Sequence, residues 1–234
     1  MVKPTPSKAS ERRYYSDLKK IARVSADLIV SHIDDWRFDT SALILLAKYA
    51  EQLKPWAIRT AEKMLRDANS QSDRFFTAQM KAISKEYNKQ LAQSIAGREA
   101  TRLLNEQVEL ITSIPIKAGL RAQELSQQAA SGGRRADEVA REILRTEEVT
   151  TSRAMLIART EVSKATATFN QARATAVGSE SYVWRTAEDS DVRDSHAALN
   201  GKVFRWDNPP YIEGEGHHHP SEIWNCRCYA DPIV

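Results

Sequence analysis

The sequence predicts an α+β fold, with a mostly helical, elongated N-terminal region and a small C-terminal α+β domain. Apolar residues recur at steps of three and four through most of residues 10–177, which is the period of an amphipathic helix. After Gly178 the period becomes two, as in a half-buried strand. Both cysteines and four of the five histidines follow that change of period. We therefore expect helices to make up most of the chain, and the chemistry to lie near its C-terminal end.

Composition limits the class of protein. The 234 residues are 28% charged and 41% hydrophobic, as is ordinary for one large folded domain or two small ones. No apolar run approaches the roughly 18 residues that a membrane span needs, and the N-terminal segment lacks the apolar centre of a signal peptide. The sequence thus predicts a protein made in a cytoplasm, where two cysteines one residue apart do not form a disulfide framework.

Charge is unevenly distributed. Residues 179–234 contain five basic and ten acidic side chains, whereas the remaining residues contain 29 basic and 21 acidic ones. A moderately basic helical region can meet nucleic acid or an acidic protein surface. Because the basic residues are scattered rather than clustered, a solvated helix surface is the simpler interpretation.

The first half of the chain is predicted to be an extended arm, residues 1–9, followed by a helical body, residues 10–131. The first helix is expected to end near His32. Asp39 to Ser41 then offer an N-cap for a second helix. We expect a kink or a break in that helix at Pro55, because proline lacks a backbone donor and clashes with the preceding turn.

A third helical segment is predicted over residues 72–114, ending before Pro115, with a bend near Gly97 as the alternative. Its long apolar stripe predicts contact with another protein. The Ser-Gly-Gly sequence at residues 131–133 is the clearest predicted hinge. We expect the C-terminal domain to occupy residues 134–234.

This domain should begin with a short helical segment near residues 137–144 and a long helix over residues 151–177. The long helix is rich in alanine and threonine, which permit close packing, and Gly178 is its expected C-cap. Three short strands are then predicted, at Tyr182 to Thr186, after Gly201, and at the terminus.

Two cysteines and the histidines predict a metal site. Cys226 and Cys228 are separated by one residue, so on an extended strand both would point to the same side and reach one ion. His196 and one of the three histidines at 217–219 would complete a tetrahedral set. We favour His219, because Pro220 restricts the conformation of the residue before it. The predicted ligands are therefore His196, His219, Cys226 and Cys228, and the predicted metal is a structural zinc. The alternative is a pair of ordinary buried cysteines.

Other polar motifs give weaker signals. Asp194, Ser195 and His196 are the residue types of a hydrolase triad, but sequence neighbours do not form one. The pair Glu213 and Glu215 lies in a glycine-rich loop and is expected to be solvated. Asp189 and Arg193 are expected to form an ion pair or a cap that shapes the turn leading to His196.

From Trp184 onward the sequence resembles the phage Mu F-like family of minor head proteins, also called head morphogenesis proteins. The resemblance rests on the following residues: Trp184, Asp189, Val192, Arg193, His196, Leu199, Gly201, Pro220, Asn225, Cys226, Arg227 and Cys228. Upstream, Arg159, Thr160 and Glu161 resemble the helix that precedes this block in the family.

The resemblance implies a virion protein of a tailed double-stranded DNA phage, assembled in the host cytoplasm. It implies association with the portal vertex and the capsid, in multiple copies per head, and action in head assembly or in DNA packaging and delivery. Zinc binding is consistent with the family, and nothing in its pattern requires catalysis. The alternatives are a DNA-coating ejection protein that uses the basic helices, and a zinc-dependent hydrolase or nuclease delivered with the genome.

Overall fold

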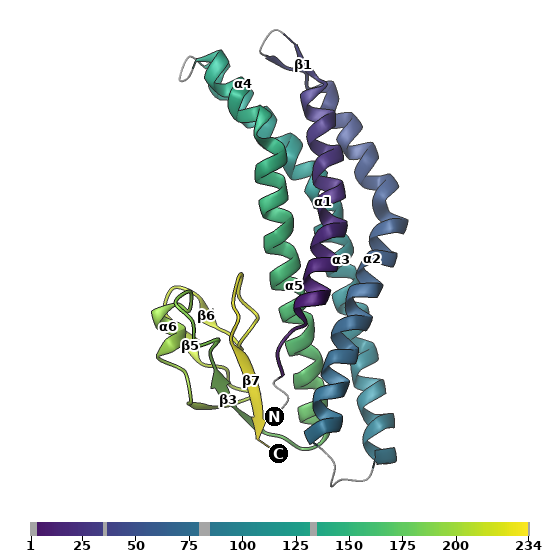
Figure 1. Cartoon of the computed structure of the whole chain (residues 1–234), viewed down its shortest axis with the longest axis vertical. Helices are drawn as coiled ribbons and strands as arrows, with labels where there is room; N and C mark the ends of the chain where they lie inside the picture. The colour runs from purple at the N-terminus through teal and green to yellow at the C-terminus, as the bar shows by residue number, and fades with distance from the viewer. Residues whose placement is uncertain (1–3, 35–36, 80–84, 132–134, 234) are drawn as a thin grey trace. The chain divides into compact units, whose positions relative to one another are not determined.

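A computed structural model of the chain describes residues 4–34, 37–79, 85–131 and 135–233, and it confirms a mostly helical α+β protein (Figure 1). The helices are α1 Lys8–Val30, α2 Ser41–Gln79, α3 Lys85–Ala130, α4 Ala136–Leu144, α5 Thr146–Ala176 and α6 Asp194–Ala197. The strands are β1 Ile33–Asp34, β2 Arg37–Phe38, β3 Ser181–Arg185, β4 Val203–Arg205, β5 Tyr211–Ile212, β6 Gly216–His217 and β7 Tyr229–Ile233. None of the helices described is long and apolar enough to cross a membrane.

Helix α2 begins where its cap was predicted. The Asp39 carboxylate accepts a hydrogen bond of 2.8 Å from the backbone N–H of Ser41, which satisfies one of the free donors of the first turn. The predicted break at Pro55 is wrong, since α2 continues through it. Leu53, Ala57 and Ala61 are buried around the proline, so packing of the flanking turns outweighs the lost backbone bond.

The boundaries predicted for the third helix are also wrong. Ser72 lies inside α2, where it is fully buried and its hydroxyl accepts a 2.7 Å hydrogen bond from Arg173. Helix α3 includes both Gly97 and Pro115 and continues to Ala130. Ile111 and Ile114, which precede the proline, are both fully buried, and this burial holds the helix together across it. Ser72 and Pro115 are residue types that often mark helix boundaries, but here tertiary packing overrides that local preference.

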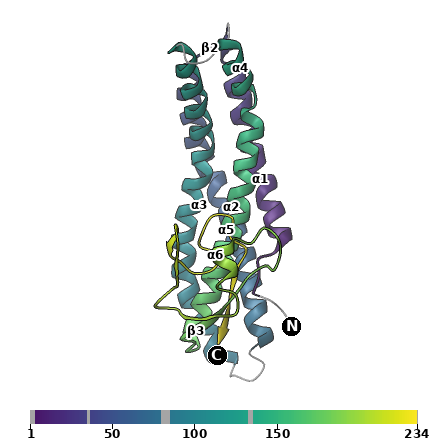
Figure 2. The ribbon, with the colours of Figure 1, turned by 90° about the vertical axis from the view of Figure 1, so that its left-hand side faces the viewer.

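The chain forms two compact units, and one of them consists of residues 12–61 and 105–158. The β1–β2 hairpin joins α1 to α2 in this unit (Figure 2). Its core combines side chains from α1, β2, α2, α3 and α4: Ile29, Phe38, Ala42, Leu46, Ala118, Ala122, Leu125, Val139 and Ile143. Gly119 permits a close approach of helices, because a Cβ there would lie 2.7 Å from Leu46 Cδ1.

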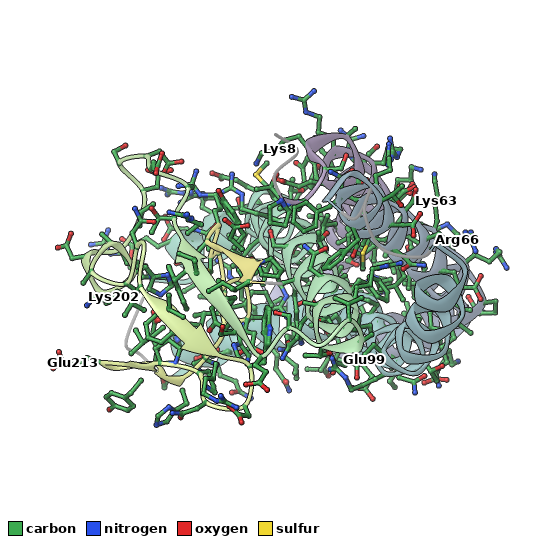
Figure 3. The ribbon with its side chains drawn as sticks, turned by 90° about the horizontal axis from the view of Figure 1, so that it is seen from below. Lys8, Lys63, Arg66, Glu99, Lys202 and Glu213 are labelled. Carbon is green, nitrogen blue, oxygen red and sulfur yellow. The ribbon has the colours of Figure 1, made fainter. Side chains whose placement is uncertain are left out.

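The other unit consists of three stretches: residues 1–11, 62–104 and 159–234. Its antiparallel sheet has the order β4-β3-β7, with Trp184 of β3 opposite Ala230 of β7. The core under this sheet also contains Phe75 and Phe76 of α2 and Ala174 of α5. Charged side chains such as Lys63, Arg66 and Lys202 point outward from this unit (Figure 3).

Gly178 ends α5 as predicted. Its φ of +88° is in the left-handed region, and the N–H of Ser179 that follows donates to the carbonyl of Ala174 at 2.9 Å. The chain then enters β3, so the predicted change from helix to strand is confirmed. Gly132 and Gly133 of the predicted hinge lie outside the described residues. The predicted division into an arm, a helical body and a C-terminal domain stays a prediction.

Candidate metal centre

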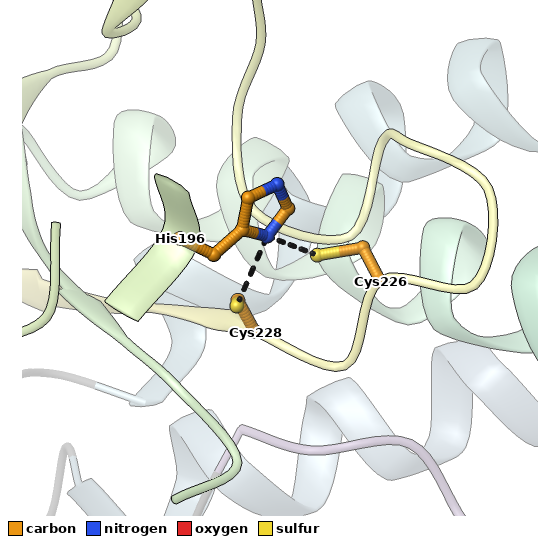
Figure 4. Close-up of side chains that lie close together, drawn as sticks. All are labelled: His196, Cys226 and Cys228. Atoms are coloured by element: carbon orange, nitrogen blue, oxygen red, sulfur yellow. Dashed lines mark hydrogen bonds between the residues drawn. The ribbon is translucent and has the colours of Figure 1, made fainter. Parts of the chain in front are cut away.

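Three of the four predicted ligands meet in the core of the sheet-containing unit (Figure 4). His196 lies on α6, and both cysteines lie in the segment just before β7. His196 Nδ1 is 3.6 Å from Cys226 Sγ and 3.5 Å from Cys228 Sγ. The three ligand atoms are all within 4.8 Å of one another, and the residues are only 2–3% exposed. A borderline-soft ion such as zinc prefers one imidazole and two thiolates of this kind.

The two cysteines lie in an irregular segment between Asn225 and β7, outside the strand itself. Ser221 and Asn225 have φ angles of +71° and +59°, in the left-handed region that residues other than glycine seldom adopt. Ser221 donates its backbone N–H to Cys226 Sγ at 3.4 Å and its hydroxyl to the Cys228 carbonyl at 2.6 Å. The expectation that the cysteines lie in a strand is therefore wrong, although the expectation that they face one point is confirmed.

A carboxylate orients the imidazole. His196 Nε2 is 2.9 Å from Glu215 Oε2, so the proton belongs on Nε2. With the proton on Nε2, the lone pair of Nδ1 faces the two sulfurs. This is the tautomer that a metal ligand requires. Arg193 in turn lies 3.5 Å from the other oxygen of Glu215. A carboxylate behind a ligating histidine is the usual outer-shell partner at zinc sites.

The three groups also perturb each other's pKa. The neighbouring Cys228 thiol lowers the pKa of Cys226 to about 4, and His196 acts in the same direction. The pKa of Cys228 is raised, first by the same Cys226 partner and then by burial. The pKa of His196 is raised, first by its bond to Cys226 and also by Glu215. The Cys226 thiol therefore loses its proton readily, whereas the Cys228 thiol keeps its proton. A divalent cation would stabilise both residues as thiolates.

Trp184 provides an independent test of fit. It is fully buried, and its indole Nε1–H has no hydrogen-bond partner among the oxygen and nitrogen atoms of the described residues. Such an orphan donor is unusual in a core. The indole lies beside Cys228 and lowers the pKa of that thiol. A Cys228 thiolate is an acceptor for this N–H, so the surroundings of the cluster suit a metal-bound sulfur.

The structure places His219, the fourth predicted ligand, outside this group of three. Its Nδ1 is 2.9 Å from the Tyr182 hydroxyl, and its ring packs against Trp206 at a centroid distance of 5.7 Å. Burial lowers the pKa of His219. The ring thus lies in the aromatic core, with its Nδ1 bonded to the Tyr182 hydroxyl. His217 and His218 bond to the backbone carbonyls of Pro209 and Glu215.

Two predictions about charged residues need correction. The ion pair predicted between Asp189 and Arg193 is wrong, because the Asp189 carboxylate accepts two 2.6 Å bonds from the Arg227 guanidinium. The predicted alternative, a cap, is confirmed, since Asp189 Oδ1 also accepts a 3.2 Å hydrogen bond from the backbone N–H of Asp191. Arg193 instead donates to the Trp224 carbonyl at 2.9 Å. Glu213 is exposed as expected (Figure 3), but Glu215 is not simply solvated, because it holds His196. The four-residue spacing misled the first prediction, since these residues lie in a loop and not on one helix.

Residues 121–230 match the profile of a family described as Phage Mu protein F like protein. These residues are similar to the Phage Mu F-like family. The resemblance seen in the sequence is thereby confirmed.

Beyond the family profile, the Mu F-like chain has a curated relative in Haemophilus influenzae, called an uncharacterized protein. The two are 35% identical over 127 residues, which is 54% of this chain and 28% of the relative. The chain thus spans little more than a quarter of that protein's length. No solved structure matches the chain significantly.

Proposed function

We propose that this Mu F-like chain is a minor capsid protein of a tailed double-stranded DNA phage, bound at the portal vertex of the head. In this proposal it contacts the portal and the major capsid protein in multiple copies per virion. It acts in head assembly and in the packaging and delivery of DNA, with which it makes nonspecific contacts. The family match over residues 121–230 is the observation that carries the proposal.

The proposed role is structural rather than catalytic. The three proposed ligands are only 2–3% exposed to solvent: His196, Cys226 and Cys228. A catalytic zinc keeps a position open to water and substrate, whereas a structural zinc is closed by the protein. A buried donor set therefore favours a cross-link between α6 and the segment before β7 over a hydrolytic centre.

Zinc is the metal proposed for this cross-link, held by His196 Nδ1 and the two cysteine sulfurs. His219 would join the ion only by exchanging its contact with Tyr182. The ion would connect α6 to the segment before β7, beside a sheet of three strands. Binding of a structural zinc contributes directly to folding free energy.

The head function is tested in the phage or prophage that encodes the chain. Purified heads should contain the chain in far fewer copies than the major capsid protein, and cross-linking should join it to the portal. Deletion of the gene should lower the yield of filled heads and leave the yield of tails unchanged. Heads that lack the chain, or full infectivity after deletion, would contradict the proposal.

The metal is tested on protein purified without chelator. We expect about one zinc per chain, lost in both Cys228→Ser and His196→Ala. His217→Ala is the matched control, because His217 is exposed and its ring contacts the Pro209 carbonyl and the Tyr211 ring, not the cysteines. Metal-free wild-type protein that gains no zinc on addition would exclude the site while leaving the family assignment untouched.

A further inference from the structure

Helix α5 reaches the cysteine segment through two adjacent residues. The Thr160 hydroxyl accepts a 3.1 Å hydrogen bond from the backbone N–H of Asn225. The Arg159 guanidinium donates a 3.0 Å hydrogen bond to the Asn225 side-chain oxygen. Asn225 immediately precedes Cys226, so one turn of α5 holds both the main chain and the side chain of the residue that introduces the first thiol.

Asn225 requires such support. It is exposed, so burial does not fix its position, yet its backbone has a φ of +59°. Asparagine tolerates this left-handed conformation better than most residues, but a lone exposed residue also samples other conformations. A change of φ at this position would rotate the chain that follows and move Cys226 away from His196. The two bonds from α5 favour the one conformation that points the thiol inward.

The helix side of this contact is itself fixed. Thr160 is 2% exposed, which restricts its hydroxyl to one place. Arg159 Nε lies 3.5 Å from a carboxylate oxygen of Glu11, an ion-pair contact and not a hydrogen bond. On the far side of the cysteine segment, Arg193 donates to the carbonyl of Trp224. The peptide between Trp224 and Asn225 is therefore held from two different elements of the same unit.

We propose that Arg159 and Thr160 are positioning residues for the metal centre: they lock Asn225 in its left-handed turn and so present Cys226 to the ion. This inference rests on the proposed metal site. The contacts join residues that are about 65 positions apart in the sequence.

The experiment uses the full chain and the substitution Thr160→Val, which keeps the side-chain volume and removes the hydroxyl. Thr160→Ser should restore the acceptor. Thr166→Val is the matched control, because Thr166 is equally buried on the same helix and donates only to the Val162 carbonyl, at 2.8 Å. Cobalt(II) is the probe, since its absorption spectrum reports thiolate ligation directly.

We expect Thr160→Val to weaken cobalt affinity by roughly 10–100-fold, the usual effect of removing an outer-shell partner. Thr160→Ser and Thr166→Val should stay close to wild type. Arg159→Gln, at a side chain that is one-third exposed, provides a second variant that should fold normally and weaken binding in the same direction. Equal cobalt affinity and spectra in Thr160→Val and Thr166→Val would overturn the inference.

A second readout separates this inference from the metal site itself. In metal-free protein, the rate at which a thiol reagent modifies Cys226 should rise in Thr160→Val and not in Thr166→Val. If wild-type protein binds no cobalt, the proposed metal site fails and the thiol rates alone decide whether α5 positions Cys226. Equal thiol rates in the two valine variants would then reject the positioning role as well.

Discussion

Replacing His219 by phenylalanine distinguishes a metal ligand from a core residue. The substitution keeps a planar ring of similar size against Trp206 and removes both ring nitrogens. If His219 serves the aromatic core, as its 2.9 Å contact with the Tyr182 hydroxyl indicates, the variant should lose stability and keep its metal. If His219 is a ligand, the variant should lose metal to the same degree as His196→Ala.

The expected loss of stability follows from the buried hydroxyl. Tyr182 is fully buried, so the variant leaves its O–H without an acceptor. An unsatisfied buried hydroxyl costs about 1–3 kcal/mol, and the retained ring limits further losses from packing. We therefore expect His219→Phe to lower the free energy of unfolding by about 1–3 kcal/mol. The double variant with Tyr182→Phe removes both polar partners and should recover most of that loss.

The assay is urea unfolding of metal-loaded protein followed by tryptophan fluorescence, with zinc content measured on the same samples. Trp184 and Trp206 lie in the affected core and report on it. Full zinc content in both single variants, with a favourable coupling in the double variant, is the expected result. Loss of zinc in His219→Phe, with no recovery of stability in the double variant, would refute the reasoning and restore the four-ligand set.

Three further predictions concern other parts of the molecule. Glu215→Gln should weaken metal binding about tenfold, measured by chelator competition, because the carboxylate that orients the ligating imidazole loses its charge; Glu213→Gln, at an exposed site, should have no effect. Gly119→Ala should lower stability by about 1 kcal/mol in thermal unfolding, because the new Cβ would lie 2.7 Å from a methyl of buried Leu46, and this clash outweighs the gain in helix propensity. Burial lowers the pKa of His219 below 6.5, so at acid pH the unfolded chain binds a proton at this residue that the native state does not. The free energy of unfolding of the wild-type protein should therefore fall relative to that of His219→Phe as the pH drops below 6.5. Parallel plots of unfolding free energy against pH for the two proteins would exclude this.

Local signals in the sequence were sufficient to predict some elements of the fold. Gly178 ends α5 because its left-handed backbone is a property of a single residue, and the change from a period of three or four to a period of two locates β3. Helix boundaries near Ser72 and Pro115 could not be predicted, because burial of neighbouring side chains overrides the local preference of a serine or a proline.

The site could be predicted only in part, for a related reason. Cys226, Cys228 and His196 carry chemistry that is recognisable from residue type alone. Glu215 and Thr160 do not, because carboxylates and hydroxyls are common and their role depends on a partner brought near by the fold. The choice among three adjacent histidines depends in the same way on which ring packs in the aromatic core.

The position of β7 has a consequence for synthesis of the chain. Strand β3 is the centre of the sheet and receives β7 along its whole length, from Ser181 opposite Ile233 to Arg185 opposite Tyr229. Phe75 and Phe76, made more than 100 residues before β3 is paired, belong to the same core. Contacts so distant in sequence form late and slowly. The sheet therefore cannot be completed, nor its shared core fully assembled, until Ile233 has left the ribosome.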